Sequence, residues 1–156
     1  MSGPYLMWRG PIEAEQCDEL GHLTVREYAQ LFSRASWPFY DFMGFGPQAM
    51  KLRRLGFADL KHVTMFQNEI HEGETVRIYS GVTRIGNKSA EMRHVLVNEA
   101  GTPCASLDVV TVQFDLEARK STLIPDDVRG KLEMHVVESW DIAPDDGGPP
   151  AHIAEN

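Results

Sequence analysis

Hydrophobic positions in the first third of the chain change from a strand-like run to a helical stripe. Residues 5–14 predict a β-strand, with Gly10-Pro11 indicating a bulge or a sheet edge. From position 25, apolar side chains then recur at steps of three or four residues, which predicts one face of an α-helix. These side chains are Val25, Tyr28, Phe32, Ala35, Phe39 and Phe42. Thr24 and Glu27 have capping-box spacing, which starts the helix there, and Pro38 is expected to kink or divide it.

Beyond residue 60 the period becomes that of β-strands. Alternating side chains predict four strands, over residues 62–71, 75–85, 89–98 and 104–114. Their connections are short, which predicts hairpins between antiparallel neighbours. A short helix with Pro47 in its first turn and Gly56 at its C-cap is expected before them, and another near Val128–Leu132. One long helix with a single apolar face must pack on one antiparallel sheet, which gives an α+β layer architecture.

Length and charge limit the classes that fit. The chain has 156 residues and a net charge of −8, which indicates a single domain. No lysine or arginine follows Lys131, whereas six acidic residues do. We therefore expect a folded domain over residues 1–132 and an acidic, partly mobile extension over residues 133–156. Without a large basic face, nucleic acid is not an expected partner.

Other features argue against a membrane protein and a metalloprotein. No apolar run reaches the ~18 residues of a membrane span, and no signal peptide is evident. Two cysteines, Cys17 and Cys104, are too few for a disulfide framework, so a cytoplasmic location is expected. The six histidines have neither HExxH nor Cys–His spacing. We therefore expect no metal and no resident cofactor.

Three segments, in order along the chain, carry a resemblance to a known family. They are Cys17–Leu23 followed by Tyr28, Ile70–Val76, and Val112–Leu116 leading to Ile124–Asp126. Together they resemble the hot-dog-fold acyl-CoA thioesterases of the 4-hydroxybenzoyl-CoA thioesterase type. The resemblance implies a five-stranded antiparallel sheet wrapped around one long helix. It also implies an acyl-CoA substrate, with coenzyme A as part of it, and a homodimer or homotetramer.

The resemblance places the catalytic carboxylate on Asp18, as nucleophile or general base. Thioester hydrolysis also needs donors for the oxyanion, and the first turn of the following helix offers unpaired N–H groups. The resemblance puts this donor between Thr24 and Arg26, Val25 included. In the alternative interpretation, Asp18 only satisfies backbone donors of its own loop. His22 either polarises the substrate carbonyl or holds the loop, and Gly21 meets a backbone requirement.

Two further groups of residues are candidates for substrate binding, one for coenzyme A and one for the acyl group. The turn after residue 85 offers Arg84, Lys88 and Ser89 for the phosphates of coenzyme A, which the resemblance implies; otherwise it is a solvated hairpin turn. Tyr28 packs in the core or reaches the ligand with its hydroxyl. An apolar pocket is expected from a set of large side chains, which in the alternative are simply core. They are Trp37, Phe39, Phe42, Met43 and Met65.

Two other functions fit the same sequence. Gln16 and Thr24 stand where many relatives have an acid and an asparagine, which favours a non-catalytic acyl-CoA-binding or sensing module. A hot-dog hydratase or dehydratase would need a His–acid dyad, for which His22 with Glu69 is the available pair.

Overall fold

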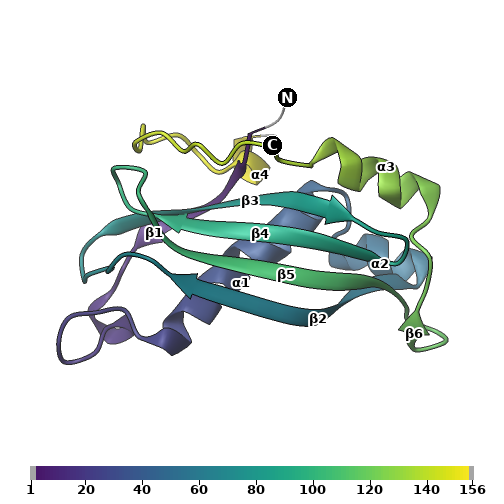
Figure 1. The fold of residues 1–156 in the computed structure, drawn as a ribbon, viewed down its shortest axis with the longest axis horizontal. Helices are drawn as coiled ribbons and strands as arrows, with labels where there is room; N and C mark the ends of the chain where they lie inside the picture. Colours follow the sequence, from purple (N-terminus) through teal and green to yellow (C-terminus); the bar gives the residue numbers. More distant parts are fainter. Residues whose placement is uncertain (1–2, 155–156) are drawn as a thin grey trace.

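The computed structural model describes residues 3–154, and these form an antiparallel sheet with one long helix across a face (Figure 1). The strands are β1 (Tyr5–Pro11), β2 (Leu55–Phe66), β3 (Thr75–Ile85), β4 (Ser89–Val97), β5 (Pro103–Asp115) and the short β6 (Lys120–Ser121). Five strands run in the order β1-β3-β4-β5-β2, and β6 pairs with β5 alone. The helical elements are the 3-10 turn η1 (Ala14–Gln16), α1 (Val25–Phe42), α2 (Pro47–Arg53), α3 (Asp126–Met134) and α4 (Ala151–Ala154). The predicted α+β fold is confirmed.

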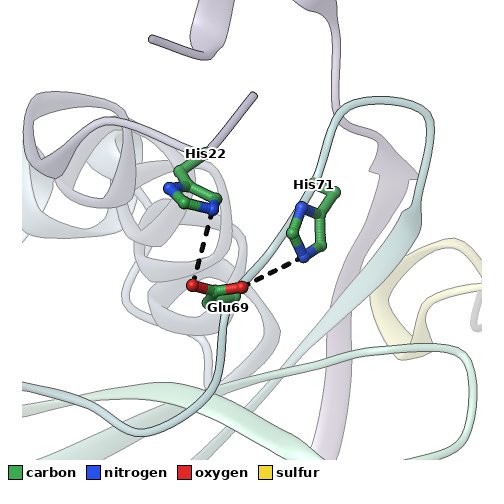
Figure 2. Close-up of side chains that lie close together, drawn as sticks. All are labelled: His22, Glu69 and His71. Atoms are coloured by element: carbon green, nitrogen blue, oxygen red, sulfur yellow. Dashed lines mark ion pairs between the residues drawn. The ribbon is translucent and has the colours of Figure 1, made fainter. Parts of the chain in front are cut away.

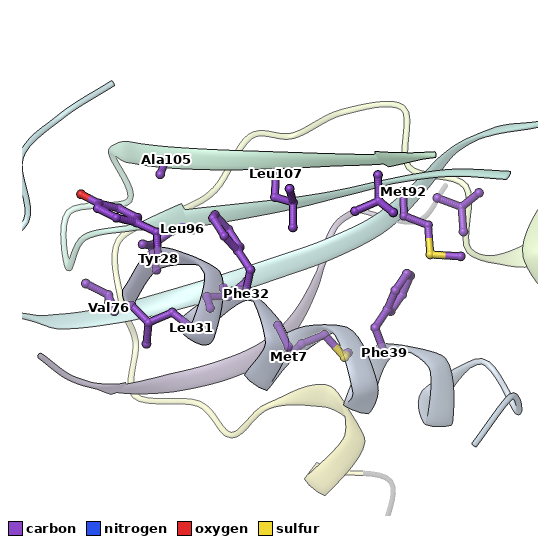
Figure 3. Close-up of a cluster of buried hydrophobic side chains, with 14 of the residues drawn as sticks. Met7, Tyr28, Leu31, Phe32, Phe39, Val76, Met92, Leu96, Ala105 and Leu107 are labelled. Carbon is purple, nitrogen blue, oxygen red and sulfur yellow. The ribbon is translucent and has the colours of Figure 1, made fainter. Parts of the chain in front are cut away.

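The core lies between α1 and the sheet. The buried face of α1 presents Tyr28, Leu31, Phe32, Ala35 and Phe39. They face buried side chains of β1 and of the central strands, as Figure 3 shows. These include Met7, Val76, Met92, Leu96, Ala105 and Leu107. Each fully buried large side chain contributes about 1.5–3 kcal/mol, so this interface fixes α1 on the sheet. The predicted stripe is confirmed at its centre, but Val25 is 71% exposed and lies outside it.

Two details of α1 differ from the prediction. Thr24 is the N-cap residue, yet its side chain makes no capping hydrogen bond, and its Oγ1 is buried without a partner among residues 3–154. The capping-box prediction is therefore wrong: the Glu27 carboxylate lies 3.6 Å from Arg26, and only backbone atoms join Glu27 to Thr24. Of the two effects expected of Pro38, a division of the helix is wrong, because α1 is continuous through it, and a kink stays a prediction. Because proline has no backbone N–H, one helical hydrogen bond is lost at this position. The free energy gained by burying the surrounding apolar face of α1 is larger than this loss.

The course of β2 is the main correction to the predicted topology. The strand begins at Leu55, directly after the left-handed Arg54 that caps α2, so Gly56 is not the C-cap. It pairs with β5 rather than with β3, and residues 72–74 are not a hairpin turn. It ends at Phe66 instead of continuing to residue 71, because the next two backbone N–H groups both bond the Cys104 carbonyl. The β3–β4 and β4–β5 hairpins are as predicted.

The first strand and the last segment both lie at the β1–β3 side of the sheet. β1 is an edge strand, as predicted, but its irregularity lies between Leu6 and Trp8. After α3 the chain returns along β3, where the Val137 N–H donates to the Val82 carbonyl at 2.9 Å. The mobility expected for residues 133–156 stays a prediction. None of the helices in the described part is long and apolar enough to cross a membrane.

One buried histidine makes the stability of this core depend on pH. The His94 ring lies under α1 with its Nδ1 2.6 Å from the Ser80 Oγ. Burial lowers the pKa of His94 from 6.5 to about 4, since the charged ring would lose its hydration. Below pH 6.5 the unfolded chain therefore binds a proton that the folded chain excludes, and stability falls as the pH drops from 6.5 towards 4.

We predict that this proton costs the wild-type protein about 2 kcal/mol of unfolding free energy between pH 7 and pH 5. Urea unfolding at both pH values measures it. His94→Asn retains a polar atom near Ser80 but does not titrate in this range, so its loss should be smaller by that amount. Equal losses in the two proteins would assign the pH dependence to other groups.

Candidate functional site

The loop between η1 and α1 holds the proposed catalytic residue. A backbone bridge between Cys17 and Leu23 closes this loop. Inside it, the Asp18 N–H donates to the His22 carbonyl at 2.8 Å, and the Gly21 N–H donates to the Asp18 carbonyl at 3.0 Å. Gly21 has a φ of 84°, a backbone conformation that residues other than glycine rarely adopt. The loop geometry therefore depends on this glycine, in keeping with its predicted backbone role.

The Asp18 side chain is exposed and is oriented by its own loop. Its Oδ1 accepts the N–H groups of Leu20, at 2.9 Å, and of His22, at 3.1 Å. Its Oδ2 accepts no hydrogen bond from the described residues. The carboxylate thus performs the loop-satisfying role of the alternative interpretation with one oxygen, while the other oxygen stays available for a substrate or a water molecule.

The N-terminus of α1 follows this loop directly and supplies free donors. The Thr24 N–H donates to the Gln16 carbonyl at 3.1 Å, so it is not available to an oxyanion. The N–H groups of Val25 and Arg26 have no hydrogen-bond partner in residues 3–154. Unpaired first-turn N–H groups at the positive end of a helix form an anion site. The predicted donor range therefore narrows to Val25 and Arg26.

His22 lies beside two side chains that precede β3. Its Nε2 is 3.4 Å from the Glu69 Oε1, and its ring meets the His71 ring edge-on with centroids 5.3 Å apart (Figure 2). The Leu23 N–H also donates to the Ile70 carbonyl at 3.1 Å, so this segment is fixed to the loop. The sequence suggested only the pair of His22 with Glu69. The position of His71 depends on a contact between distant segments that no local spacing reveals.

A cavity of about 380 Å³ lies between α1 and the β2–β5 edge of the sheet. One part of its wall is apolar, with Trp37, Phe57 and Leu107, and another part is polar, with Ser33 and Ser36. Of the five side chains predicted for the pocket, only Trp37 lines it. The others are Phe39 and Met43, which are buried in the core, Phe42, which is half-buried, and Met65, which is exposed.

Tyr40 and the pair of Asp59 and His62 complete the polar side of this cavity. The His62 Nε2 lies 2.8 Å from the Asp59 Oδ2. Burial raises the pKa of the Tyr40 hydroxyl, which keeps it protonated and able to donate a hydrogen bond. Tyr28 is not part of the cavity lining: it is buried, its ring packs edge-on against Phe66 at 4.9 Å, and burial raises its pKa.

The residues expected to bind coenzyme A lie in the β3–β4 turn, far from the loop of Asp18. The two regions are at opposite ends of the sheet in Figure 1. Arg84 forms a loose ion pair with Glu91, at 3.9 Å, and Lys88 is exposed with no ion pair in the part of the chain described. The Ser89 carbonyl closes the turn by accepting the Gly86 N–H. One chain does not bring these residues together with Asp18.

A long helix packed across one antiparallel sheet is the architecture of the hot-dog class of α+β domains. A family model of the thioesterase-like superfamily matches residues 12–132, and the chain belongs to this superfamily. A search of curated proteins finds no match.

Solved structures agree on the fold. A hypothetical protein from Staphylococcus aureus in complex with CoA is 16% identical, with a TM-score of 0.77 over 98% of this chain and 94% of that one. A predicted thioesterase from Bacillus stearothermophilus is 23% identical, with a TM-score of 0.73 over 85% and 96%. A gentisyl-coenzyme A thioesterase is 18% identical, with a TM-score of 0.68 over 80% and 98%.

Proposed function

We propose that the protein hydrolyses acyl-CoA thioesters with Asp18 as the catalytic carboxylate. The observation that carries this proposal is the arrangement of the loop: Asp18 is anchored through one oxygen, and α1 begins next to the loop with two unpaired N–H groups, on Val25 and Arg26. Membership of the thioesterase-like superfamily supports the reaction class. Release of free thiol from acyl-CoAs, by the wild type and by Asp18→Asn, is the test.

In the proposed reaction the free Asp18 oxygen attacks the thioester carbonyl or removes a proton from an attacking water. Negative charge then develops on the carbonyl oxygen, and the first-turn N–H groups of α1 stabilise it. The C–S bond breaks, coenzyme A leaves as the thiol, and one water molecule is consumed to give the carboxylic acid. Both routes have the same overall balance, and both require the Asp18 carboxylate to be charged.

The cavity under α1 is the proposed acyl site. Its volume of about 380 Å³ suits a compact acyl group better than a long chain. Ser33, Ser36 and the Asp59–His62 pair line it, and these groups favour an acyl group that carries a hydroxyl or another polar substituent. An aromatic ring would pack against Trp37. The CoA part is supported by the Staphylococcus aureus neighbour, which was solved with CoA.

The proposed assembly is a homodimer formed through β2. This strand is 12 residues long and has no partner strand on its outer side among the described residues, and it exposes Leu60, Val63, Met65 and Phe66. Such an edge is a template for pairing with a second copy. When two β2 strands pair antiparallel, the two-fold symmetry turns one sheet end for end relative to the other. Because the β3–β4 turn and the loop before α1 lie at opposite ends of the sheet (Figure 1), the turn of one copy would then lie at the end where the other copy carries the Asp18 loop.

We therefore predict that Leu60→Lys combined with Met65→Lys converts a dimer to a monomer, because four like charges would meet across the edge. Light scattering after size exclusion should show the mass fall from twice 17.5 kDa to 17.5 kDa, with loss of thiol release. Leu52→Lys, at an 84% exposed position on α2, is the matched control and should stay dimeric. A wild type that is monomeric at micromolar concentration contradicts the assembly.

A hydratase is the second candidate, because His22 and Glu69 lie 3.4 Å apart, beyond hydrogen-bond length but within the range from which catalytic contacts tighten when substrate binds. It predicts loss of the conjugated absorbance of a 2-enoyl-CoA on hydration. This loss should depend on Glu69 and occur without thiol release.

A further inference from the structure

Three potential metal ligands converge beside the loop of Asp18. The carboxylate of Glu69 lies between the two imidazoles: its Oε1 is 3.4 Å from the His22 Nε2 and its Oε2 is 3.4 Å from the His71 Nε2. One ligand atom from each residue can be chosen so that all three lie within 4.8 Å of one another. Figure 2 shows the three side chains pointing at a common region from two separate segments.

The spacing differs from that of a direct hydrogen bond. A nitrogen–oxygen hydrogen bond spans 2.7–3.2 Å, as His62 and Asp59 illustrate at 2.8 Å. The two distances of 3.4 Å around Glu69 are longer. Each distance, made by a different oxygen of Glu69, agrees with the separation of two ligands on a tetrahedral zinc ion, because bonds of about 2.1 Å place neighbouring ligands about 3.4 Å apart.

The backbone holds these ligands in place. An isolated antiparallel bridge joins His22 to His71. The His22 N–H donates to the Asp18 carboxylate at 3.1 Å, and the His71 N–H donates to the Glu74 carboxylate at 2.6 Å. Both imidazoles therefore extend from anchored backbone positions, which lowers the entropic cost of gathering them around an ion. The carboxylates of Asp18, Glu69 and Glu74 also give this region a negative charge, which favours a cation.

We propose that His22, Glu69 and His71 bind a divalent first-row transition metal ion of the Zn²⁺ type. Two imidazoles and one carboxylate are a ligand set that zinc takes in proteins, and three protein ligands leave a coordination position for water or a ligand. The sequence predicted no metal because the ligands come from two distant segments. Since His22 also bonds Asp18, an ion at this site would tie the candidate catalytic loop to the segment before β3.

The test uses the full-length protein with Co²⁺ as a spectroscopic probe and Zn²⁺ as a competitor. The wild type should develop the intense visible bands of low-coordinate Co²⁺, and Zn²⁺ should abolish them. Glu69→Gln and His71→Ala should each weaken Zn²⁺ binding at least ~10-fold by titration calorimetry, since removing even a supporting partner of a ligand has that effect. His62→Ala is the control, because it alters a His–Asp pair outside the cluster and should leave Zn²⁺ affinity unchanged.

Absence of visible bands, or equal Zn²⁺ affinity in the wild type and the two ligand variants, would overturn the site and leave a simple ion-pair cluster. Where a variant fails to fold, the wild type decides the question alone. Its histidine ring NMR signals should shift with Zn²⁺ at His22 and His71 and stay in place at His62. Shifts at His62 without shifts at the other two would also overturn the proposal. None of these readouts depends on thioesterase activity.

Discussion

Replacing Asp18 with asparagine is expected to lower kcat for acyl-CoA hydrolysis at least ~100-fold while KM and thermal stability change little. Loss of one positioned acid–base or nucleophilic group has an effect of this size. Asparagine keeps an oxygen in the position of Oδ1, so the hydrogen bonds from the Leu20 and His22 N–H groups are retained. The substitution therefore removes the charge and leaves the loop intact.

Thiol release from short, long, branched, aromatic and hydroxylated acyl-CoAs measures this effect. Glu19→Gln is the matched control, because Glu19 is an exposed acid of the same loop and should keep full activity. Asp18→Ala, in contrast, also removes the acceptor and should lower the melting temperature. If Asp18→Asn hydrolyses the best substrate as fast as the wild type, the carboxylate only satisfies its loop.

Other results of the same panel distinguish the remaining functions. Binding without thiol release would indicate an acyl-CoA-binding module. Hydration of a 2-enoyl-CoA that disappears in Glu69→Gln would indicate the dyad of His22 with Glu69. A hydratase dyad of His22 with Glu69 would conflict with a zinc ion held by the same two side chains. A positive hydratase assay would therefore argue against the metal site, and Zn²⁺ binding would argue against the dyad.

Local patterns predict the elements of this fold well, because the physics that sets them is local. The helix from residue 25 follows from an apolar stripe, and the observed helix α1 spans the whole stripe to Phe42. The capping box is the instructive failure. Thr24 and Glu27 have the right spacing, yet Thr24 bonds the Gln16 carbonyl through its N–H, and its hydroxyl is turned into a buried site. The conformation of Thr24 is therefore set by its contacts with neighbouring segments rather than by the spacing to Glu27.

Strand order depends on contacts that the sequence does not state. A short polar connection such as residues 72–74 predicts a hairpin, but β2 pairs with β5. This pairing gives β5 a partner on both sides and leaves β2 at the edge, which a periodicity argument cannot distinguish from the predicted order. The register, and the exposed row of β2 side chains, become visible only with the sheet assembled.

The candidate site also has a part that depends on local sequence and a part that depends on contacts between distant segments. Asp18, Gly21 and Val25 belong to one continuous segment, so a sequence pattern can group them, and their roles at the site stay predictions. The β3–β4 turn, which contains Lys88, lies at the other end of the sheet, and the proposed second copy of the chain would bring it near them. The contact of His71 with His22 was not predicted, since it is a bridge between segments far apart in the chain.

The second large effect is expected at Val25, where a proline would remove one of the two proposed oxyanion donors and little else. Val25 is the first residue of α1, a position that accepts proline because its N–H has no helical partner. The preceding Thr24 has φ −75° and ψ 153°, the extended conformation that a residue before proline prefers. The Val25 side chain is 71% exposed, so its replacement disturbs no core contact.

We expect Val25→Pro to lower kcat by about 10²–10³-fold, the cost of losing one oxyanion donor. Val25→Ala retains the N–H and removes the same side chain, so it should stay near wild-type activity. The contrast between the two variants isolates a single backbone hydrogen atom. Equal melting temperatures would show that α1 still forms. If both variants remain fully active, the Val25 N–H is not the donor, and only the Arg26 N–H is left among the unpaired groups of this helix turn.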